Sequence, residues 1–404
     1  MNEHYIHSTR IYTQYGLRNG YILERDGIIR DILLQAPERD AEIIDYGDSR
    51  IIPGIIDVHN HGYGGWSMTD PVTPEIFRGY VKACASIGIT TILPTVTKEA
   101  PGIEGIVEGI KCPYTGAYVY GIHSEGPFWA RGGEHTVGES WPEPSVDVAK
   151  KYIDRCQGYL KVMAIAPELP HAHEVMHFLH QQDVRVAACH TKANAQQIKD
   201  AMADAGIDIV THLCNGMQGI HHRDAGALGA FLLDDHLSYE LIADLNHVCA
   251  DMIRLLLRLQ PYEKFILISD SNYIAGLPSG IYERYGSKNF STEKGLIVDE
   301  NGRIRGSGKC VLSNMEKLVN AVGVPFEQVV KMASENPAAY LGISHLTGSI
   351  APGKQLDIAI ISDDYKCLAT YVKGRLVYDS GTDADVFNPD ALRRRIGDLP
   401  EDMR

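Results

Sequence analysis

The chain has 404 residues, which at about 150 residues a domain corresponds to two or three domains, or to one large domain with a small one. Hydrophobic residues make up 44% and charged residues 22%, as in folded proteins with a sizeable core, and this balance excludes a disordered or fibrous chain. The net charge of −14 argues against a nucleic-acid partner, and the lack of a long apolar run or an apolar leader predicts a cytoplasmic protein without membrane contact.

Both ends of the chain have the pattern of half-buried antiparallel strands, in which apolar and polar residues interleave. The segments with this pattern are 4–13, 19–35 and 41–46 near the start, and 357–361, 368–372 and 375–378 near the end. We therefore predict a small β-sandwich domain formed by residues 1–50 together with residues 350–404.

The middle of the chain, residues 51–349, alternates continuous apolar runs with helical patterns. The eight apolar runs are 51–58, 89–95, 116–123, 159–165, 184–190, 207–211, 238–243 and 264–269, and the clearest helical patterns are 74–85, 145–156, 194–205 and 251–259. Strands that are apolar on both faces and separated by helices are typical of a parallel α/β sheet, and eight of them predict a closed (β/α)8 barrel. A doubly wound open sheet is the alternative. The stretch 276–310 is predicted to be a long insertion after the eighth strand.

Ionisable residues follow the ends of six of these predicted strands. They are His59 and His61 after the first, His123 and Glu125 at the third, His190 at the fifth, His212 at the sixth, His247 after the seventh and Asp270 at the eighth. Because barrel active sites lie at the carboxyl ends of the strands, we expect these side chains to converge. Imidazole and carboxylate ligands suit zinc and neighbouring transition metals, and the His-x-His spacing puts both rings on one side of a strand. The pattern predicts a divalent metal site.

Other histidines and the cysteines have simpler interpretations. His171, His173, His177 and His180 have helical spacing but lie on a predicted outer helix, so we expect them to be solvent-exposed. His221 and His222 adjoin the sixth loop, where a substrate-side or structural role is favoured over metal ligation. The eight cysteines include no Cys-x-x-Cys pair and are expected to be buried free thiols.

Five motifs occur in order along nearly the whole chain. They are 52–62 (IPGIIDVHNHG), 123–128 (HSEGPF), 211–217 (THLCNGM), 336–342 (NPAAYLG) and 348–357 (GSIAPGKQLD). Together they resemble the amidohydrolase superfamily and, within it, the N-acetylglucosamine-6-phosphate deacetylase family. In that family a glutamate takes the metal-bridging place that a carboxylated lysine holds in other members.

The resemblance implies a set of metal ligands. Glu125, His190 and His212 would hold one ion, and His59, His61 and Asp270 would approach a second position, which gives one or two ions per subunit. Zn2+ is the expected metal, with Fe2+ or Mn2+ as alternatives. Asp270 is also the expected catalytic general base and then general acid.

The resemblance also implies substrate contacts and a homodimer. His135 would be catalytic by contacting the acetamide carbonyl of the substrate, and Asn215 and Gly216 would meet the sugar phosphate. His247 would add a further contact, and Arg223 would reach the site of the neighbouring subunit.

The implied reaction is hydrolysis of the N-acetyl group of N-acetylglucosamine 6-phosphate, which gives glucosamine 6-phosphate and acetate. A deacetylase of N-acetylgalactosamine 6-phosphate, or another amidohydrolase acting on an N-acylated small molecule, is the alternative, and a non-catalytic binding protein is a more distant one. Leu245 stands where the family usually has glycine, and the segment 271–273 (SNY) is bulkier than usual, so the identity of the sugar stays open. Gly216 in place of the usual alanine is expected to be harmless to a backbone contact.

Overall fold

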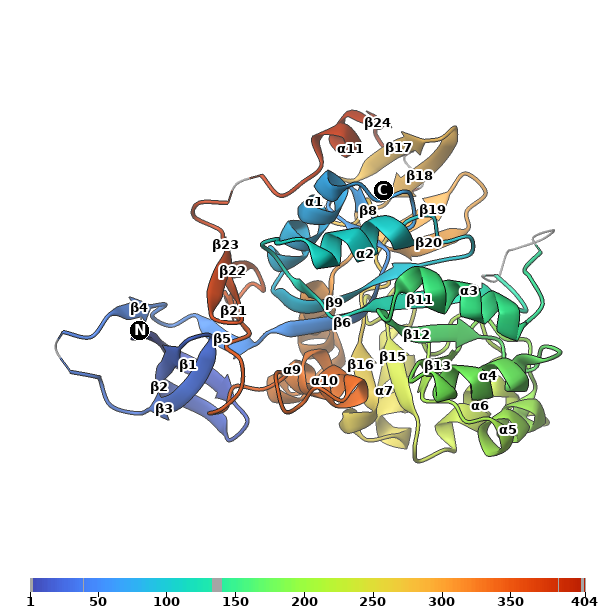
Figure 1. Ribbon diagram of the computed structural model, residues 1–404, viewed down its shortest axis with the longest axis horizontal. Coiled ribbons are helices and arrows are strands. Elements are labelled where there is room, and N and C mark those ends of the chain that lie inside the picture. Colours follow the sequence, from blue (N-terminus) through green and yellow to red (C-terminus); the bar gives the residue numbers. More distant parts are fainter. Residues whose placement is uncertain (1–2, 39, 133–139, 384, 401–402, 404) are drawn as a thin grey trace.

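A parallel barrel forms the centre of the molecule in the computed structural model, which describes residues 3–38, 40–132, 140–383, 385–400 and 403 (Figure 1). Its strands, in spatial order, are β6 (Ile55–Asn60), β9 (Ile89–Val96), β10 (Tyr118–Val119) continued by β11 (Ile122–Phe128), β12 (Leu160–Ile165), β13 (Arg185–Ala188), β14 (Ile209–Val210), β15 (Ser238–Leu241) and β16 (Phe265–Leu267). The eighth strand meets the first beyond its end, where the Asp270 N–H donates to the His59 carbonyl (3.0 Å) and the His61 N–H donates to the Ser271 carbonyl (3.1 Å). The predicted barrel is confirmed, and the open sheet is excluded.

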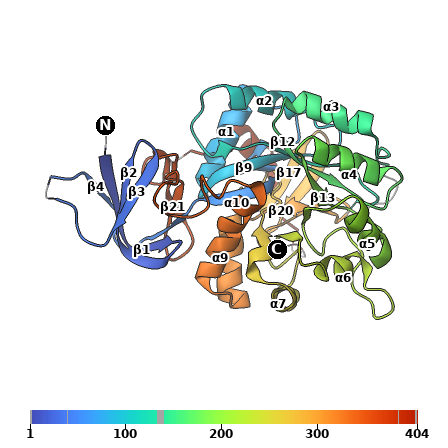
Figure 2. The same ribbon diagram turned by 60° about the horizontal axis from the view of Figure 1, so that its bottom comes forward.

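Helices cover the outside of the barrel (Figure 2). They are α1 (Pro74–Ala85), α2 (Ile103–Lys111), α3 (Val146–Cys156), α4 (Ala172–Gln181), α5 (Ala195–Asp204), α6 (Gly226–Leu232), α7 (Ala250–Leu259), α8 (Val311–Lys317), α9 (Phe326–Ala333) and α10 (Glu335–Leu341), with a 3-10 turn at Tyr262–Lys264 and a π-helical turn at Leu318–Val322. Local signals explain where two of them begin. Thr73 caps α1 ahead of Pro74, and Asn194 forms a capping box with Gln197 at the start of α5. The four predicted helices are observed within one residue at each end.

Strands from both ends of the chain form one eight-stranded sheet beside the barrel (Figure 1). Its members are β1 (Glu3–Thr13), β2 (Gly16–Arg25), β3 (Ile28–Leu33), β4 (Ile43–Asp45), β5 (Arg50–Pro53), β21 (Ile358–Ile361), β22 (Cys367–Val372) and β23 (Arg375–Asp379). β5 pairs with β1 from the start of the chain and with β21 from its end, so it joins the two segments. This small terminal domain agrees with the sequence prediction.

The predicted strand 51–58 is divided at Gly54 into β5 of the terminal sheet and β6 of the barrel. A Cβ atom at Gly54 would lie 2.1 Å from Thr90 Oγ1, so only glycine fits where the chain passes from one sheet to the other. Apolar continuity does not reveal this division, because the residues on both sides are buried.

The insertion after the eighth strand forms an antiparallel sheet at the barrel mouth. It comprises β17 (Gly280–Arg284), β18 (Ser287–Ser291), β19 (Leu296–Asp299) and β20 (Ile304–Ser307), and β24 (Arg395–Gly397) joins it at the edge. The Ser307 N–H donates to the Asp270 carbonyl at 2.8 Å, so this sheet is attached directly to the end of the eighth strand. A short hairpin of β7 (Gly62–Tyr63) and β8 (Trp66–Ser67) lies beyond the first strand.

The predicted domain limit at 350–404 requires a correction at the end of the chain. Arg395–Gly397 pairs with β17 of the insertion, and α11 (Pro389–Arg393) precedes it, whereas the terminal sheet ends at β23. Ala391 packs in a small core with Tyr273, Tyr282 and Ile297, which explains why the last segment returns to the barrel mouth. A strand of three residues has too little pattern for sequence analysis to place it. Within the described ranges, no helix is long and apolar enough to cross a membrane.

Candidate active site

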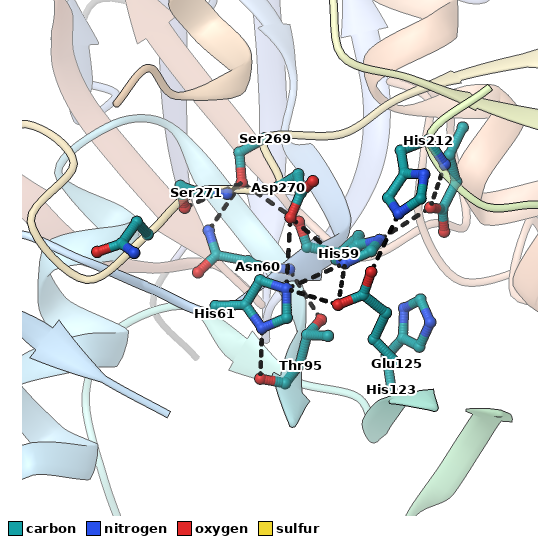
Figure 3. Close-up of polar contacts among 12 residues, drawn as sticks. His59, Asn60, His61, Thr95, His123, Glu125, His212, Ser269, Asp270 and Ser271 are labelled. Atoms are coloured by element: carbon teal, nitrogen blue, oxygen red, sulfur yellow. Dashed lines mark hydrogen bonds and ion pairs between the residues drawn. The ribbon is translucent and has the colours of Figure 1, made fainter. Parts of the chain in front are cut away.

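Six predicted ligands from five different strands lie together at the carboxyl end of the barrel. Figure 3 shows His59, His61, Glu125, His212 and Asp270 among them. Glu125 Oε1 is 3.0 Å from His190 Nε2 and 3.0 Å from His212 Nε2, and these two nitrogens are 3.3 Å apart. These three residues form one compact set of donors. The predicted first metal position therefore has its three side chains in contact.

His59, His61 and Asp270 form a second set next to the first. Asp270 Oδ1 is 3.5 Å from His59 Nε2 and 3.3 Å from His61 Nε2, and the two ring nitrogens are 3.2 Å apart. Glu125 belongs to both sets, because its other oxygen, Oε2, is 3.3 Å from His61 Nε2. A carboxylate with one oxygen directed to each set has the geometry of a metal-bridging ligand.

The donor atoms fit a transition-metal ion. At metal–ligand distances of about 2.0–2.1 Å, tetrahedral ligand atoms lie about 3.3 Å from one another, which matches the separations within both sets. Within each set, the two imidazole Nε2 atoms face one another at hydrogen-bond distance. A shared cation would stabilise two nitrogen lone pairs that are directed at the same point. Imidazole and carboxylate donors suit zinc, iron and manganese better than magnesium or calcium.

The chain turns sharply at three of these ligands. His190, His212 and Asp270 have φ values of +45°, +32° and +46°, in the left-handed region that non-glycine residues rarely adopt. Each such residue costs about 1–2 kcal/mol. Because backbone strain of this kind concentrates at functional sites, the turns are consistent with side chains held in position for chemistry.

A buried carboxylate below the mouth connects the first strand to the eighth. Asp57 Oδ2 accepts hydrogen bonds from Ser269 Oγ (2.6 Å) and Asn60 Nδ2 (3.1 Å), and its Oδ1 accepts the backbone N–H groups of Ser269 and His59. Burial raises the pKa of Asp57 to about 6. Sequence reasoning missed this residue, although an acidic residue within an apolar run was an available signal.

Contacts at the Nδ1 atoms of His59 and His61 determine the orientation of the two rings. His59 Nδ1 contacts Glu240 Oε2 at 2.9 Å, and His61 Nδ1 contacts the Thr95 carbonyl at 3.2 Å, so both Nε2 atoms face the mouth. Glu240 was also missed by sequence reasoning. Like Asp57, it is the acidic residue of an apolar run, 238–243.

Electrostatic interactions in the site favour positive charge on the rings of His59 and His61, whereas burial lowers the pKa of His190. Burial by itself would lower the pKa of His59, but Glu240, Asp270 and Glu125 raise it to about 10. Burial would likewise lower the pKa of His61, which Asp270 and Glu125 raise to about 9. Burial would raise the pKa of Asp270, yet the adjacent His59 and His61 hold it at about 2. These carboxylates therefore attract a cation to the point where the rings converge.

Cys189 lies beneath the first ligand set, with its Sγ 3.8 Å from both Glu125 Oε1 and His212 Nε2. All eight cysteines are free, as predicted, and five of them are buried. The prediction that all are buried is wrong for Cys112 and Cys249, which are exposed because they stand at helix ends, and Cys214 is half-buried.

The predicted substrate-binding residues are only partly within the described chain. His135 lies outside the described residues. The side chain of His247 is 5% exposed, its Nδ1 contacts Asp244 Oδ2 at 2.8 Å, and its Nε2 has no partner among the described residues. Asn215 follows the sixth strand and donates from Nδ2 to the His212 carbonyl at 3.1 Å. Arg223 is exposed in the turn 221–224.

The residues expected to be unusual for the family have structural explanations. Leu245 has a φ of +66°, a conformation that glycine adopts without strain. Ser271 donates from Oγ to the Gly62 carbonyl at 2.7 Å, so it helps to close the barrel, and Tyr273 packs under the Arg284 guanidinium. Gly216 also has a positive φ of +61°, and a Cβ atom there would lie 3.0 Å from His190 Nδ1.

The histidines of the outer helix α4 lie on the surface, as predicted. Their side chains are 35–66% exposed, and each meets a separate surface carboxylate or shares Asp204 with a neighbour. His221 and His222 are exposed as well, in the turn beside Arg223. Within the described ranges, none of these histidines belongs to a group of converging ligand atoms.

A model of the amidohydrolase family matches residues 50–377. The chain belongs to the amidohydrolase family. It is 31% identical to an N-acetylglucosamine-6-phosphate deacetylase of Vibrio furnissii, over 89% of this chain and 91% of that protein. It is also 31% identical to an N-acetylgalactosamine-6-phosphate deacetylase of Escherichia coli O157:H7, over 92% of this chain and 99% of that protein.

A solved structure has the same fold. The crystal structure of an N-acetylglucosamine-6-phosphate deacetylase from Pasteurella multocida superposes with a TM-score of 0.85 at 23% identity, and the match covers 93% of this chain and 99% of that one. Family membership and the deacetylase relatives show that this member of the family is a hydrolase that acts on amides. Amidohydrolases are typically metal-dependent, in agreement with the converging ligand groups.

Proposed function

We propose that the protein removes the acetyl group from N-acetylglucosamine 6-phosphate with the help of a bound divalent ion, most simply Zn2+. The observation that carries this proposal is the convergence of Glu125, His190 and His212 with a second set of donors at one rim of the barrel. The deacetylase relatives support the substrate class, because they match nearly the whole length of this chain.

The residues of the site suggest how the amide is cleaved. A divalent ion held by Glu125, His190 and His212 would polarise the amide carbonyl and lower the pKa of water from 15.7 to about 7. Asp270 accepts the proton of the attacking water and passes it to the departing nitrogen. An amine is much more basic than a carboxylate, so the protonated Asp270 carboxyl can give up this proton to the departing nitrogen. His135 is proposed to hydrogen-bond the acetamide oxygen.

The phosphate of the substrate is proposed to lie against Asn215 and Gly216. Gly216 has the left-handed backbone that brings an N–H group close to a ligand, and His247 offers a buried Nε2 nearby.

Arg223 is proposed to contact the substrate in the neighbouring subunit of a homodimer. Its side chain is exposed in the turn 221–224, where a second subunit can reach it. Light scattering of the purified protein tests the dimer, and a monomer would remove this role of Arg223.

The galactosamine isomer is the second candidate, because the Escherichia coli relative has the same 31% identity over an even larger share of both chains. The deciding experiment combines elemental analysis of the purified protein with acetate release from both acetylated hexosamine 6-phosphates and from unphosphorylated N-acetylglucosamine. The proposal predicts a bound transition metal and the highest kcat/KM for N-acetylglucosamine 6-phosphate. Equal values for phosphorylated and unphosphorylated sugars would refute a phosphate site, and a higher value for the galactosamine isomer would reverse the choice.

A further inference from the structure

Glu240 is a carboxylate buried in the interior of the barrel. It lies in β15 with 1% of its surface exposed, and the same interior contains apolar side chains such as Val58, Ile242 and Ile268. A charge in such a place is costly unless it is matched by hydrogen-bond donors. The hydrogen-bond partners of Glu240 therefore indicate its role in the structure.

One oxygen of Glu240 contacts both halves of the metal-ligand cluster. Oε2 is 2.9 Å from His59 Nδ1, in the second set, and accepts the backbone N–H of His212, in the first set, at 3.2 Å. The main-chain carbonyl of Glu240 also accepts the N–H of Leu213 at 2.8 Å. Residues far apart in the sequence are thus held at one point.

The contact with His59 selects the form of the ring that binds a metal. A carboxylate at Nδ1 requires a proton there, which leaves the lone pair on Nε2 directed at Asp270 and His61. Within the described chain, the other three histidine ligands have no carboxylate at Nδ1. His61 uses the Thr95 carbonyl, and the Nδ1 atoms of His190 and His212 have no partner among the described residues.

The contact with His212 supports a strained turn. His212 has a φ of +32°, and its backbone persists in that conformation only if neighbouring groups hold it. The side chain and the main chain of Glu240 bind two successive N–H groups at this turn, so they fix the direction in which the His212 ring leaves the strand.

We propose that Glu240 is a positioning residue that keeps the two ligand sets in register for the metal. This inference rests on the proposed function for the presence of a metal, and the test below measures metal binding without a substrate. A residue with this role supports metal affinity more than it supports the fold.

The experiment compares Glu240→Met and Glu240→Gln with the wild type. Methionine fills a similar volume but accepts no such hydrogen bond, whereas glutamine keeps an acceptor oxygen for His59. Metal-free proteins are titrated with Zn2+ in competition with a chromophoric chelator, and Tm is measured on the same samples. Glu24→Met is the matched control, because Glu24 is also a buried glutamate but lies in β2 of the terminal sheet.

Glu240→Met is expected to weaken Zn2+ binding ~10- to 100-fold. Its metal-free Tm is expected to fall no further than that of Glu24→Met, since each change removes one buried carboxylate and leaves its partners unpaired. Glu240→Gln should bind Zn2+ with an affinity close to the wild type, and at saturating Zn2+ the methionine variant should lose kcat with little change in KM.

Unchanged Zn2+ affinity in a folded Glu240→Met protein would overturn the proposal, as would an equal loss in Glu24→Met. If Glu240→Met does not fold, Glu240→Gln provides the test. A Zn2+ affinity of Glu240→Gln as weak as that of a variant lacking His59 would contradict the role of the residue 240 oxygen as acceptor. A wild type that binds Zn2+ but releases no acetate would refute only the proposed substrate. A wild type that binds no divalent ion would refute this inference as well.

Discussion

Two groups of histidines in this protein have acidic neighbours, but only one of them has the geometry of a metal site. The mouth group consists of His59, His61, His190 and His212, and the α4 group consists of His171, His173, His177 and His180. The mouth side chains are 0–14% exposed, whereas those of the α4 group are 35–66% exposed. Charges in the mouth therefore interact in a poorly screened environment, and those on α4 are screened by water and salt.

The direction of the ring nitrogens separates the groups further. In the mouth, the Nε2 atoms of His59 and His61 at the first strand are 3.2 Å apart, and those of His190 and His212 from two other strands are 3.3 Å apart. The two oxygens of Glu125 join these pairs, at 3.0 Å from His190 Nε2 and 3.3 Å from His61 Nε2. On α4, His173 and His180 are paired with different carboxylates, Asp204 and Asp208. The comparison teaches that histidine spacing along a helix is weak evidence for a metal, and that convergence from several strands in a buried place is strong evidence.

The largest expected effect comes from Glu125, which touches both ligand sets. Glu125→Gln should lose the bound ion and with it all acetate release, because the bridging charge is removed. Metal content by elemental analysis and acetate release by an enzymatic assay measure this. His177→Ala in the α4 group is the control and should match the wild type in both. Loss of metal from His177→Ala would show that the α4 group also contributes to metal binding.

A smaller loss of activity is expected when Asp270, the proposed general base, is replaced. Asp270→Asn should lower kcat about 10²- to 10⁴-fold, the usual contribution of a general base, while Glu125, His190 and His212 still hold an ion. The measurement is single-substrate kinetics on protein with known metal content. Asp204→Asn, which removes a carboxylate from the α4 group, should leave kcat unchanged. An Asp270→Asn enzyme with most of its kcat and its metal in place would show that another residue moves the proton.

The smallest expected effect is a pH dependence of stability in the metal-free protein. The pKa values of His59 and His61 are raised from 6.5 to about 10 and about 9, so their protonated rings stabilise the fold fully below pH 6.5. This contribution is lost as the pH rises through 9 and 10. Asp57, with a pKa of about 6, has lost most of its protons by about pH 7, before the rings of His59 and His61 begin to titrate.

Thermal denaturation between about pH 6.5 and pH 10 tests this expectation. The Tm of the metal-free protein should fall across the range more steeply than that of the Zn2+-loaded protein, in which the ion supplies the positive charge. His61→Asn should reduce the slope of the metal-free form. Equal slopes with and without metal would mean that the ring protons do not contribute to stability.

The sequence predicted the barrel and the gathering of possible metal ligands at its mouth because both are encoded locally. Apolar runs alternate with helical patterns, and the ligands Glu125, His190, His212 and Asp270 come at the ends of such runs. The helical patterns placed the starts of α1 and α5 to within one residue, where the structure shows Thr73 and Asn194 as caps. The supporting residues were not predicted, because an acidic residue in an apolar run has no visible partner in the sequence.

The sequence by itself thus determined which strands and helices form and which chemistry stands at the strand ends, since side-chain periodicity and residue type are properties of short segments. Only the tertiary structure decided that Glu240 meets His59, that Asp57 links the first strand to the eighth and that the last segment pairs with β17. These contacts join residues separated by 100 to more than 200 positions, and the separation of their atoms depends on how the barrel closes. The closure is a property of the whole sheet.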